Sequence, residues 1–281
     1  MDRTVRASAL FFLIMLTFYI SGVRAGLRGK SFLGVFVLGL LLIGIAFLTG
    51  YFSPRQPKTV ALDVGLSFLR LILVFLSLFW VQDLISKEIE RRTVMFSLAY
   101  PVPRAHYLLG RYLAIQTMSV LVALGMAVLL WGAVALAGGS YEQQFPVNLG
   151  WPYWIALSGI VLDAAVVSAF ALWIATVSTT PMLPLAAGLI FAAVGKSLGA
   201  VMDFLARGAD GDAALAARFD PIIGLIRWIL PDLSRLDWRA AALYNQPMDG
   251  TLMGWSICMA LAYAGIMLLA ATLSFSRREF F

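Results

Sequence analysis

Three charged residues lie within long apolar stretches of this sequence. They are Arg70, Asp163 and Lys196, each flanked on both sides by mainly aliphatic and aromatic residues. Burying a charge in such a stretch costs free energy unless the charge is paired or reaches a polar region. Ionisable side chains in such stretches of a membrane protein pair with one another, line a polar pathway or bind an ion. These residues are therefore the first candidates for a structural or pathway role inside the molecule.

The depth of each residue decides which partners it can reach. At about 1.5 Å per helical residue, Asp163 lies roughly 18 Å and Lys196 roughly 11 Å from the outer end of its stretch, and Arg70 has a depth similar to that of Lys196. One alternative is a pair between Asp163 and Lys196. The other is that Arg70 and Lys196 extend their charged ends to the outer interface, which is favoured for Arg70. Asp163 is too short to do this, so a structural or pathway partner is expected.

A second candidate is the charged stretch KEIERRTVMFSLAYPVPR at residues 87–104, between two long apolar segments. Apolar residues recur on one helical face, and charged residues occupy the rest of the surface: Lys87, Glu88, Glu90, Arg91 and Arg92. Both glutamates precede the arginine pair, which suits the helix dipole. Pro101 and Pro103 then stop the helix. A short amphipathic surface helix is expected, which either anchors the topology or docks a protein partner.

The composition points to an integral membrane protein. Of the 281 residues, 61% are hydrophobic and only 13% are charged, against about a quarter charged in soluble domains. The single cysteine, Cys258, excludes an intramolecular disulfide. The single histidine, His106, argues against a multi-histidine metal centre or a His-paired nucleophile. The net charge of +6 fits membrane topology rather than nucleic-acid binding.

Six stretches are long and apolar enough to cross a bilayer, which requires about twenty residues. They lie at residues 32–51, 64–84, 107–136, 151–177, 181–204 and 252–275. No linker, low-complexity run or repeat of fixed period divides the chain. A single all-α membrane domain is therefore expected over residues 1–281.

The distribution of lysine and arginine orients these spans, because cytoplasmic loops carry the excess of basic residues. With the N-terminus in the cytoplasm, twelve of the 21 basic residues fall before span one, between spans two and three, or after span six. The two short outer loops hold only Arg55 and Lys58. Both termini and the charged stretch are therefore expected on the cytoplasmic side.

The N-terminal region, residues 1–31, contains the apolar segment ASALFFLIMLTFYI, which is too short to span comfortably. Its basic start and the following VRAG also resemble a signal peptide. Cleavage there would leave Arg28 and Lys30 on the outside, against the charge distribution. A helix lying in the cytoplasmic interface is preferred, and a signal or spanning segment at residues 8–20 stays open.

The outer loop, residues 205–250, contains two apolar segments with helix signals. Asp220 and Pro221 favour the start of one helix, which Pro231 ends. A second helix is expected over residues 233–244. Trp228 and Trp238, one in each helix, suit a membrane interface. Within span five, Gly195 and Gly199 form a small-xxx-small pair suited to close helix packing.

The segment from Glu88 to Arg111 resembles the signature of ABC-2-type transporter permeases. The matching residues, which follow span two in the family's order, are Glu88, Glu90, Thr93, Ser97, Leu98, Pro101, Arg104, Gly110 and Arg111. The family has six spans in the type V exporter fold, an amphipathic helix before span one and two short helices before span six. Arg92 stands where a glycine is common, and Met95 stands where an acidic residue is common.

The resemblance implies a role for several of these segments. Residues 85–105 would form the coupling helix, in which Glu88, Glu90, Arg91, Arg92, Thr93, Pro101 and Arg104 contact a separate ATPase subunit. That partner would bind ATP and Mg, since no nucleotide-binding motif and no cofactor site is recognised in this chain. Trp228, Pro231 and Trp238 would belong to an outer gate, or alternatively to a surface cap without a gating role.

The resemblance also implies an assembly and a location. A second copy of this permease, or a related permease in a heterodimer, would complete the transporter, which would export a substrate across a bacterial inner membrane. No residue selects the substrate, and nucleic acid is not an expected partner. The alternative is an ion-coupled secondary transporter that uses Asp163 and Lys196. A membrane-embedded enzyme is disfavoured because no cluster of catalytic groups can be assembled.

Overall fold

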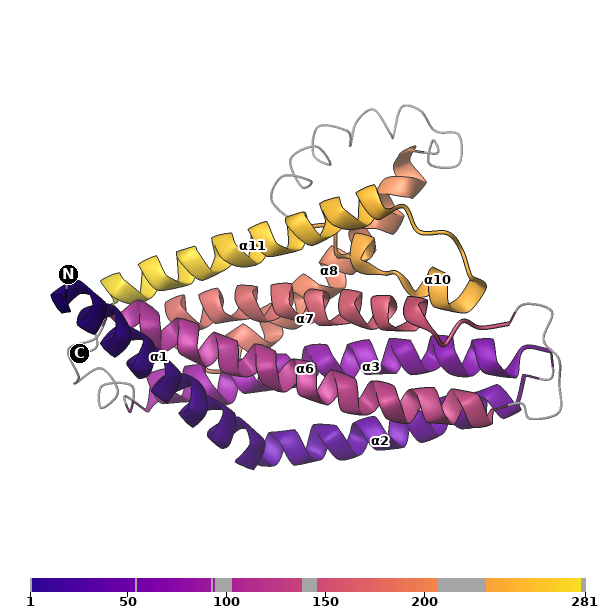
Figure 1. Cartoon of the computed structure of the whole chain (residues 1–281), viewed down its shortest axis with the longest axis horizontal. Helices are drawn as coiled ribbons and strands as arrows, with labels where there is room; N and C mark the ends of the chain where they lie inside the picture. Colours follow the sequence, from indigo (N-terminus) through magenta and orange to yellow (C-terminus); the bar gives the residue numbers. More distant parts are fainter. Residues whose placement is uncertain are drawn as a thin grey trace.

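The computed structural model describes residues 2–53, 55–91, 93, 103–137, 146–206 and 231–278, and every regular element in these ranges is helical (Figure 1). The long helices are α1 (Asp2–Arg28), α2 (Lys30–Tyr51), α3 (Pro57–Val81), α6 (Arg104–Leu136), α7 (Trp151–Val177), α8 (Leu183–Ala206) and α11 (Gly250–Arg277). The short elements are a π-helical turn η1 (Gln82–Ser86), α4 (Lys87–Glu90), a 3-10 turn η3 (Leu233–Leu236) and α10 (Arg239–Tyr244). The expected all-α class is confirmed for these ranges.

Six helices in the described part of the chain are long and apolar enough to cross a membrane. They are Phe32–Tyr51, Pro57–Glu90, Arg104–Leu136, Trp151–Val177, Leu183–Met202 and Gly250–Arg277. These agree with the six predicted stretches, although the second begins at Pro57 rather than at residue 64 and continues to Glu90. The chain therefore has the features of a multi-pass membrane protein.

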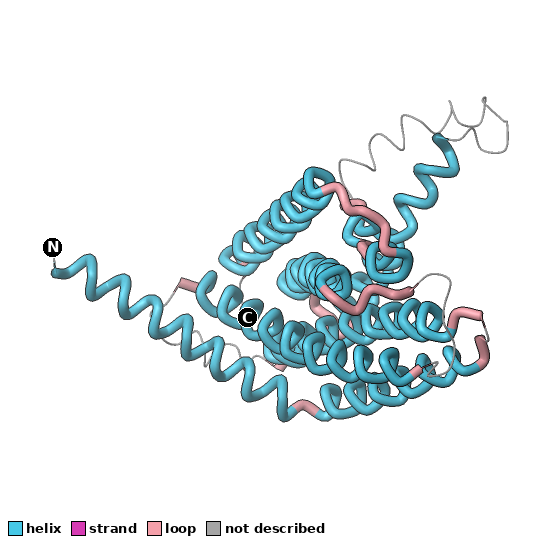
Figure 2. The backbone as a smooth tube through the Cα atoms, turned by 45° about the vertical axis from the view of Figure 1, so that its right-hand side comes forward, coloured by secondary structure: helices cyan, strands magenta, loops and turns pink. Residues whose placement is uncertain are grey.

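The helices run along a common direction, with α3 and α7 in the middle of the bundle (Figures 1 and 2). Helix α3 contacts α2, α6, α7 and α8, and α7 contacts α11 and α8 as well. By contrast, α2 and α11 turn much of their apolar surface outward, and Leu33, Leu41 and Leu261 are each more than half exposed. Apolar side chains on the outside of a bundle fit contact with lipid.

Helix α1 lies across one end of the bundle and packs against α6 (Figure 1). Two small residues allow the close approach. A Cβ atom at Gly22 would lie 2.9 Å from the Cβ of Ala114, and one at Gly26 would lie 2.6 Å from the side chain of Met118. Gly29 alone separates α1 from α2, with extended backbone angles of φ −66° and ψ 135°. The apolar N-terminal segment is thus part of one continuous helix that ends in a sharp corner.

The charged stretch begins as a direct continuation of α3, which differs from the expected separate helix starting near Ile85. The backbone stays helical from Pro57 to Glu90, and the Lys87 amide donates to the Gln82 carbonyl across the π turn. A π turn holds one more residue than an α-helical turn, so it changes the direction in which later side chains point. No boundary forms at Ile85 because Leu84, Ile85 and Ile89 are all buried against the bundle.

Residues 231–244 form two short elements instead of the single helix expected over 233–244. The turn η3 and helix α10 are separated at Asp237 and Trp238, where the backbone leaves the helical region. Leu233 and Leu236 are fully buried, and η3 contacts α7, α8 and α11. At this break, Asp237 forms ion pairs with Arg70 of α3 and Lys196 of α8. The other predicted outer helix, at residues 221–230, lies outside the described residues.

Candidate functional site

A buried ion pair joins α3 to α7. The Nε atom of Arg70 donates to Asp163 Oδ2 at 2.5 Å, and the two side chains are only 12% and 5% exposed. Arg70 also donates to Asp237 Oδ2 at 3.3 Å and to the Leu233 carbonyl at 3.4 Å. One arginine therefore connects two helices to the segment that follows η3.

Asp237 is the centre of this cluster because it accepts hydrogen bonds from three cations. Lys196 of α8 binds Asp237 Oδ2 at 2.5 Å, and Arg239 binds both carboxylate oxygens at 2.7 and 2.9 Å. Arg239 also reaches Asp63 at 3.1 Å. The hydrogen bond to Asp237 raises the pKa of the Arg239 guanidinium above its ordinary value, so this side chain stays charged. Asp63, Arg70, Asp163, Lys196, Asp237 and Arg239 form one cluster, called the outer cluster after the side that the distribution of basic residues predicts for it.

Two sequence-based interpretations of this region are wrong. Arg70 does not extend to the interface, because Asp163 and Asp237 neutralise its charge inside the bundle. Asp163 pairs with Arg70 rather than with Lys196, whose ion-pair partner is Asp237. Asp237 and Arg239 were missed. The only signal was the run DWR at residues 237–239, in which two opposite charges flank Trp238, and such a run is common in polar loops.

A cavity of about 360 Å³ adjoins the outer cluster. Its lining is mainly apolar side chains of α3 and α8, including Val74, Phe75 and Leu189, with Arg70, Asp163 and Lys196 at one side. The Asp163 Oδ1 atom is buried and has no hydrogen-bond partner among the described residues. A buried acceptor without a donor is costly, so this oxygen provides a place for a water, a proton or a ligand donor.

Residues 231–238 are held against α7 and α8 by close packing contacts at three glycines. A Cβ atom at Gly159 of α7 would lie 2.3 Å from the Leu236 carbonyl oxygen and 3.1 Å from the Trp238 ring. Gly195 and Gly199, expected to pack against another spanning helix, instead face Leu233 and Ser234. Of the predicted gate residues, Pro231 and Trp238 are buried here, and Trp228 lies outside the described residues.

A second charged group lies at the opposite end of α3. Glu88 accepts from Arg111 at 2.6 Å and from the Tyr107 hydroxyl at 2.6 Å, both in α6. Arg111 is only 7% exposed in its side chain, and its guanidinium carbon lies 5.6 Å from the Tyr107 ring centre. Glu88 was expected to face a partner protein, but its carboxylate is already used to join the end of α3 to α6.

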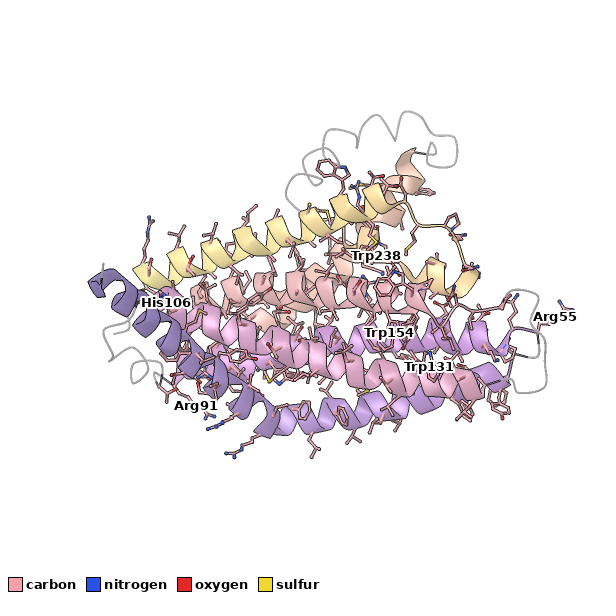
Figure 3. The ribbon with its side chains drawn as sticks, in the orientation of Figure 1. Arg55, Arg91, His106, Trp131, Trp154 and Trp238 are labelled. Atoms are coloured by element: carbon pink, nitrogen blue, oxygen red, sulfur yellow. The ribbon has the colours of Figure 1, made fainter. Side chains whose placement is uncertain are left out.

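The remaining charges of the predicted coupling segment are more open. Glu90 and Arg91 are exposed, and Thr93 donates from its hydroxyl to the Glu88 carbonyl at 3.2 Å. Figure 3 shows Arg91 and Arg55 at opposite ends of the bundle. Arg92 and Pro101 lie outside the described residues. Within the described part of the segment, Glu90 and Arg91 are thus the side chains best placed to meet another protein.

Arg104 was expected to contact the ATPase, but it binds the C-terminal end of α11. Its guanidinium donates to the carbonyls of Phe275, Ser276 and Arg278 at 3.2, 3.4 and 2.8 Å. Arg278 in turn donates to the Thr176 carbonyl at 2.7 Å and the Ser178 carbonyl at 2.9 Å, at the end of α7. Cations satisfy the free carbonyls of a helix C-terminus and its partial negative charge.

No group of three or more His, Cys, Asp or Glu side chains in the described residues has metal-binding geometry. No protein-family model and no curated protein matches the sequence. The functional interpretation therefore depends on the motif, the six apolar helices and the two charged groups.

Proposed function

We propose that this chain is the membrane subunit of an ATP-binding cassette exporter of the ABC-2 permease type. The observation that carries the proposal is the residue order from Glu88 to Arg111, which follows the second of six apolar helices as in that family. In this proposal the chain binds no nucleotide itself. A separate ATPase subunit binds ATP and Mg, and a second permease copy completes the transporter in a bacterial inner membrane with both termini inside.

The geometry suggests how ATPase movement would reach the membrane region. Glu90 and Arg91 are exposed at the end of a helix that continues without a break to Pro57. That same helix carries Arg70, the residue that joins α3 to α7 and to Asp237. A force applied at Glu90 would therefore be passed along α3 to the outer cluster, because a continuous helix transmits displacement along its axis.

The first experiment is to purify the tagged chain gently from its native membrane and to measure ATP hydrolysis. We expect a co-purifying ATPase in stoichiometric amount. A pure preparation that neither contains an ATPase nor responds to ATP would overturn the proposal.

Charge reversal identifies the docking residues. E90K and R91E are each expected to lower ATPase co-purification several-fold, because like charges placed across an interface repel. R55E is the matched control, since Arg55 is also an exposed arginine beside a helix end but lies at the other end of the bundle (Figure 3). An equal loss in R55E and R91E would contradict the assignment of the docking surface.

An ion-coupled secondary transporter is the second candidate, and one observation favours it. Asp163 combines a buried, unpartnered oxygen with a position on a 360 Å³ cavity, which suits a proton- or ion-binding carboxylate. Uptake or efflux that follows an ion gradient without ATP, and that D163N abolishes, would support this candidate over the first.

A further inference from the structure

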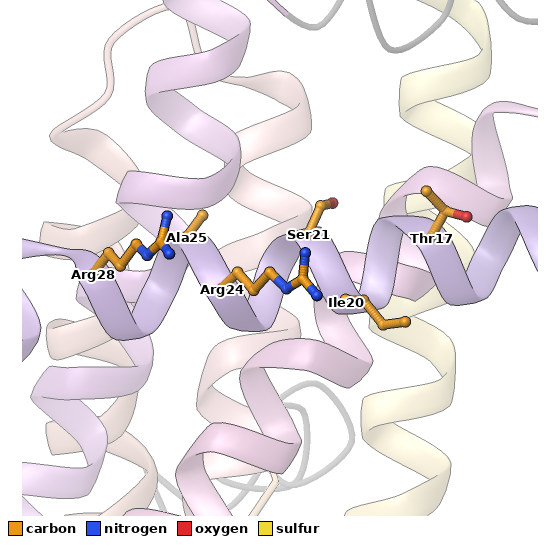
Figure 4. A pocket seen from close by; sticks show the side chains of 6 residues that line it. All are labelled: Thr17, Ile20, Ser21, Arg24, Ala25 and Arg28. Carbon is orange, nitrogen blue, oxygen red and sulfur yellow. The ribbon is translucent and has the colours of Figure 1, made fainter.

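Helix α1 carries two exposed arginines one turn apart on the side turned away from the bundle. Arg24 and Arg28 lie in line with Thr17 and Ser21, at the spacing that places residues on one helical face. Figure 4 shows their guanidinium groups on the same side of α1. Together with Ile20 and Ala25, these residues line an open hollow of about 570 Å³. The lining of the hollow thus combines two cations and two hydroxyl groups with the apolar side chains of Ile20 and Ala25.

The direction of this face is fixed by the packing of the opposite face. Gly22 and Gly26 are buried against α6, and the Tyr19 hydroxyl donates to Thr117 at 3.2 Å. The Trp80 indole donates to the Gly26 carbonyl at 3.3 Å. Helix α1 cannot rotate without breaking these contacts, so Arg24 and Arg28 are held facing outward.

Neither arginine has a carboxylate partner among the described residues. This separates them from Arg104, Arg111 and Arg278 at the same end of the molecule. Arg111 pairs with Glu88, and Arg104 and Arg278 bind helix-terminal carbonyls. Two adjacent guanidinium groups without a carboxylate partner can both donate hydrogen bonds to one oxyanion, such as a phosphate.

The surroundings indicate that the phosphate belongs to a lipid. Leu16, Ile20 and Leu27 are 37%, 40% and 45% exposed, so apolar side chains flank the arginines on α1. The first apolar span begins at Phe32, four residues after Arg28 and just past the corner at Gly29. Headgroups lie at this level, and a helix with basic and apolar surfaces sits there with its apolar side in the acyl region.

We propose that Arg24 and Arg28 bind the phosphate of an anionic phospholipid, whose acyl chains lie against Ile20 and Leu27. The Ser21 hydroxyl proton is already donated to the Phe18 carbonyl at 3.0 Å, so the two guanidinium groups supply the donors. The site belongs to this chain alone and does not depend on an ATPase partner. Its failure would therefore leave the proposed transport function untouched.

The test measures binding of short-chain phosphatidylglycerol to the purified full-length chain in a neutral detergent. Short-chain phosphatidylcholine and glycerol phosphate are measured in parallel. We expect phosphatidylglycerol to bind at least tenfold more tightly than either, with an affinity that falls as salt rises. R24Q/R28Q is expected to remove this preference, and R24K/R28K to weaken it because lysine lacks the planar fork.

The matched control is R55Q/K58Q, which removes two positive charges at the opposite end of the bundle. It should bind phosphatidylglycerol like the unmodified chain, and unfolding without lipid should be the same for both double variants. Equal binding of the two lipids, an equal loss in both double variants, or equally tight binding of glycerol phosphate would each overturn the lipid site.

Discussion

Arg70 and Asp163 form the most buried ion pair of the described residues. Both side chains are nearly excluded from the surface, and Asp163 has no other ion-pair partner among the described residues. Removing one member of such a pair costs far more than the pair itself contributes, because the other charge stays buried without compensation. Lys196 differs, since its side chain is 34% exposed and Asp237 keeps two other cations.

R70Q is therefore expected to lower the free energy of unfolding by about 3–5 kcal/mol. K196Q is expected to cost only about 0–1 kcal/mol, as for exposed pairs. The measurement is unfolding in mixed micelles with increasing dodecyl sulfate, followed by tryptophan fluorescence.

A double variant gives the internal check on this prediction. R70Q/D163N should be more stable than R70Q, because it removes the uncompensated carboxylate as well. Equal stability of R70Q and K196Q would contradict the buried pair.

At the scale of elements, the close contact between α7 and η3 requires glycine at position 159. The Leu236 carbonyl lies where a side chain at position 159 would begin. Backbone atoms cannot move aside as a flexible side chain can, so the contact tolerates only a hydrogen at this position. The packing of residues 231–238 against α7, and with it the position of Asp237, therefore depends on the absence of a side chain at Gly159.

G159A should consequently cost about 1–3 kcal/mol of stability through overpacking. It should also expose the chain near Asp237 to added protease. G265A in α11 is the matched control, because nothing lies within 4 Å of the position of its Cβ atom. Alanine there should be neutral or stabilise the helix by up to about 1 kcal/mol. A stable, protease-resistant G159A would show that the segment can move away from α7 at no cost.

At the scale of the whole molecule, two arginines join three helix ends at the side where α1 also lies. Arg104 at the start of α6 binds the end of α11, and Arg278 just beyond α11 binds the end of α7. R278Q should lose hydrogen bonds from a charged donor to three carbonyls and cost about 1–3 kcal/mol.

Its neighbour supplies the control for this prediction. Arg277 is exposed and makes no hydrogen bond or ion pair in the described residues, so R277Q should stay within about 0.5 kcal/mol of the original protein. The same micelle unfolding measurement compares the two variants. A similar loss in both would mean that overall charge, rather than the contact with α7, is responsible.

The six candidate membrane-spanning helices of the described residues could be predicted from the sequence because apolar length is a local property. The ends of these helices were less accurate. At Ile85 the sequence favours a new amphipathic helix, yet burial of Leu84, Ile85 and Ile89 keeps α3 continuous. The ion pairs of Asp237, at the break between η3 and α10, could not be predicted either, because their cations come from α3 and α8 and are far away in the sequence.

The sequence identified individual candidate residues better than it identified their partners. Arg70, Asp163 and Lys196 stand out because charges are rare in apolar stretches. Their partners depend on which faces of α3, α7 and α8 pack together, and the hydrophobic periodicity of one helix does not predict its neighbours. Glu88 was recognised as important, but its contact with Arg111 in α6 requires the turn of direction at η1.

The bond between Arg278 and the end of α7 has a consequence for biosynthesis. The Thr176 carbonyl leaves the ribosome 102 residues before the guanidinium that satisfies it. Helix α7 can be inserted early, but the carbonyls of its last turn are covered only after α11 and Arg278 have been synthesised. A chain that stops before Arg278 would thus contain the long helices described above, with the end of α7 left uncovered.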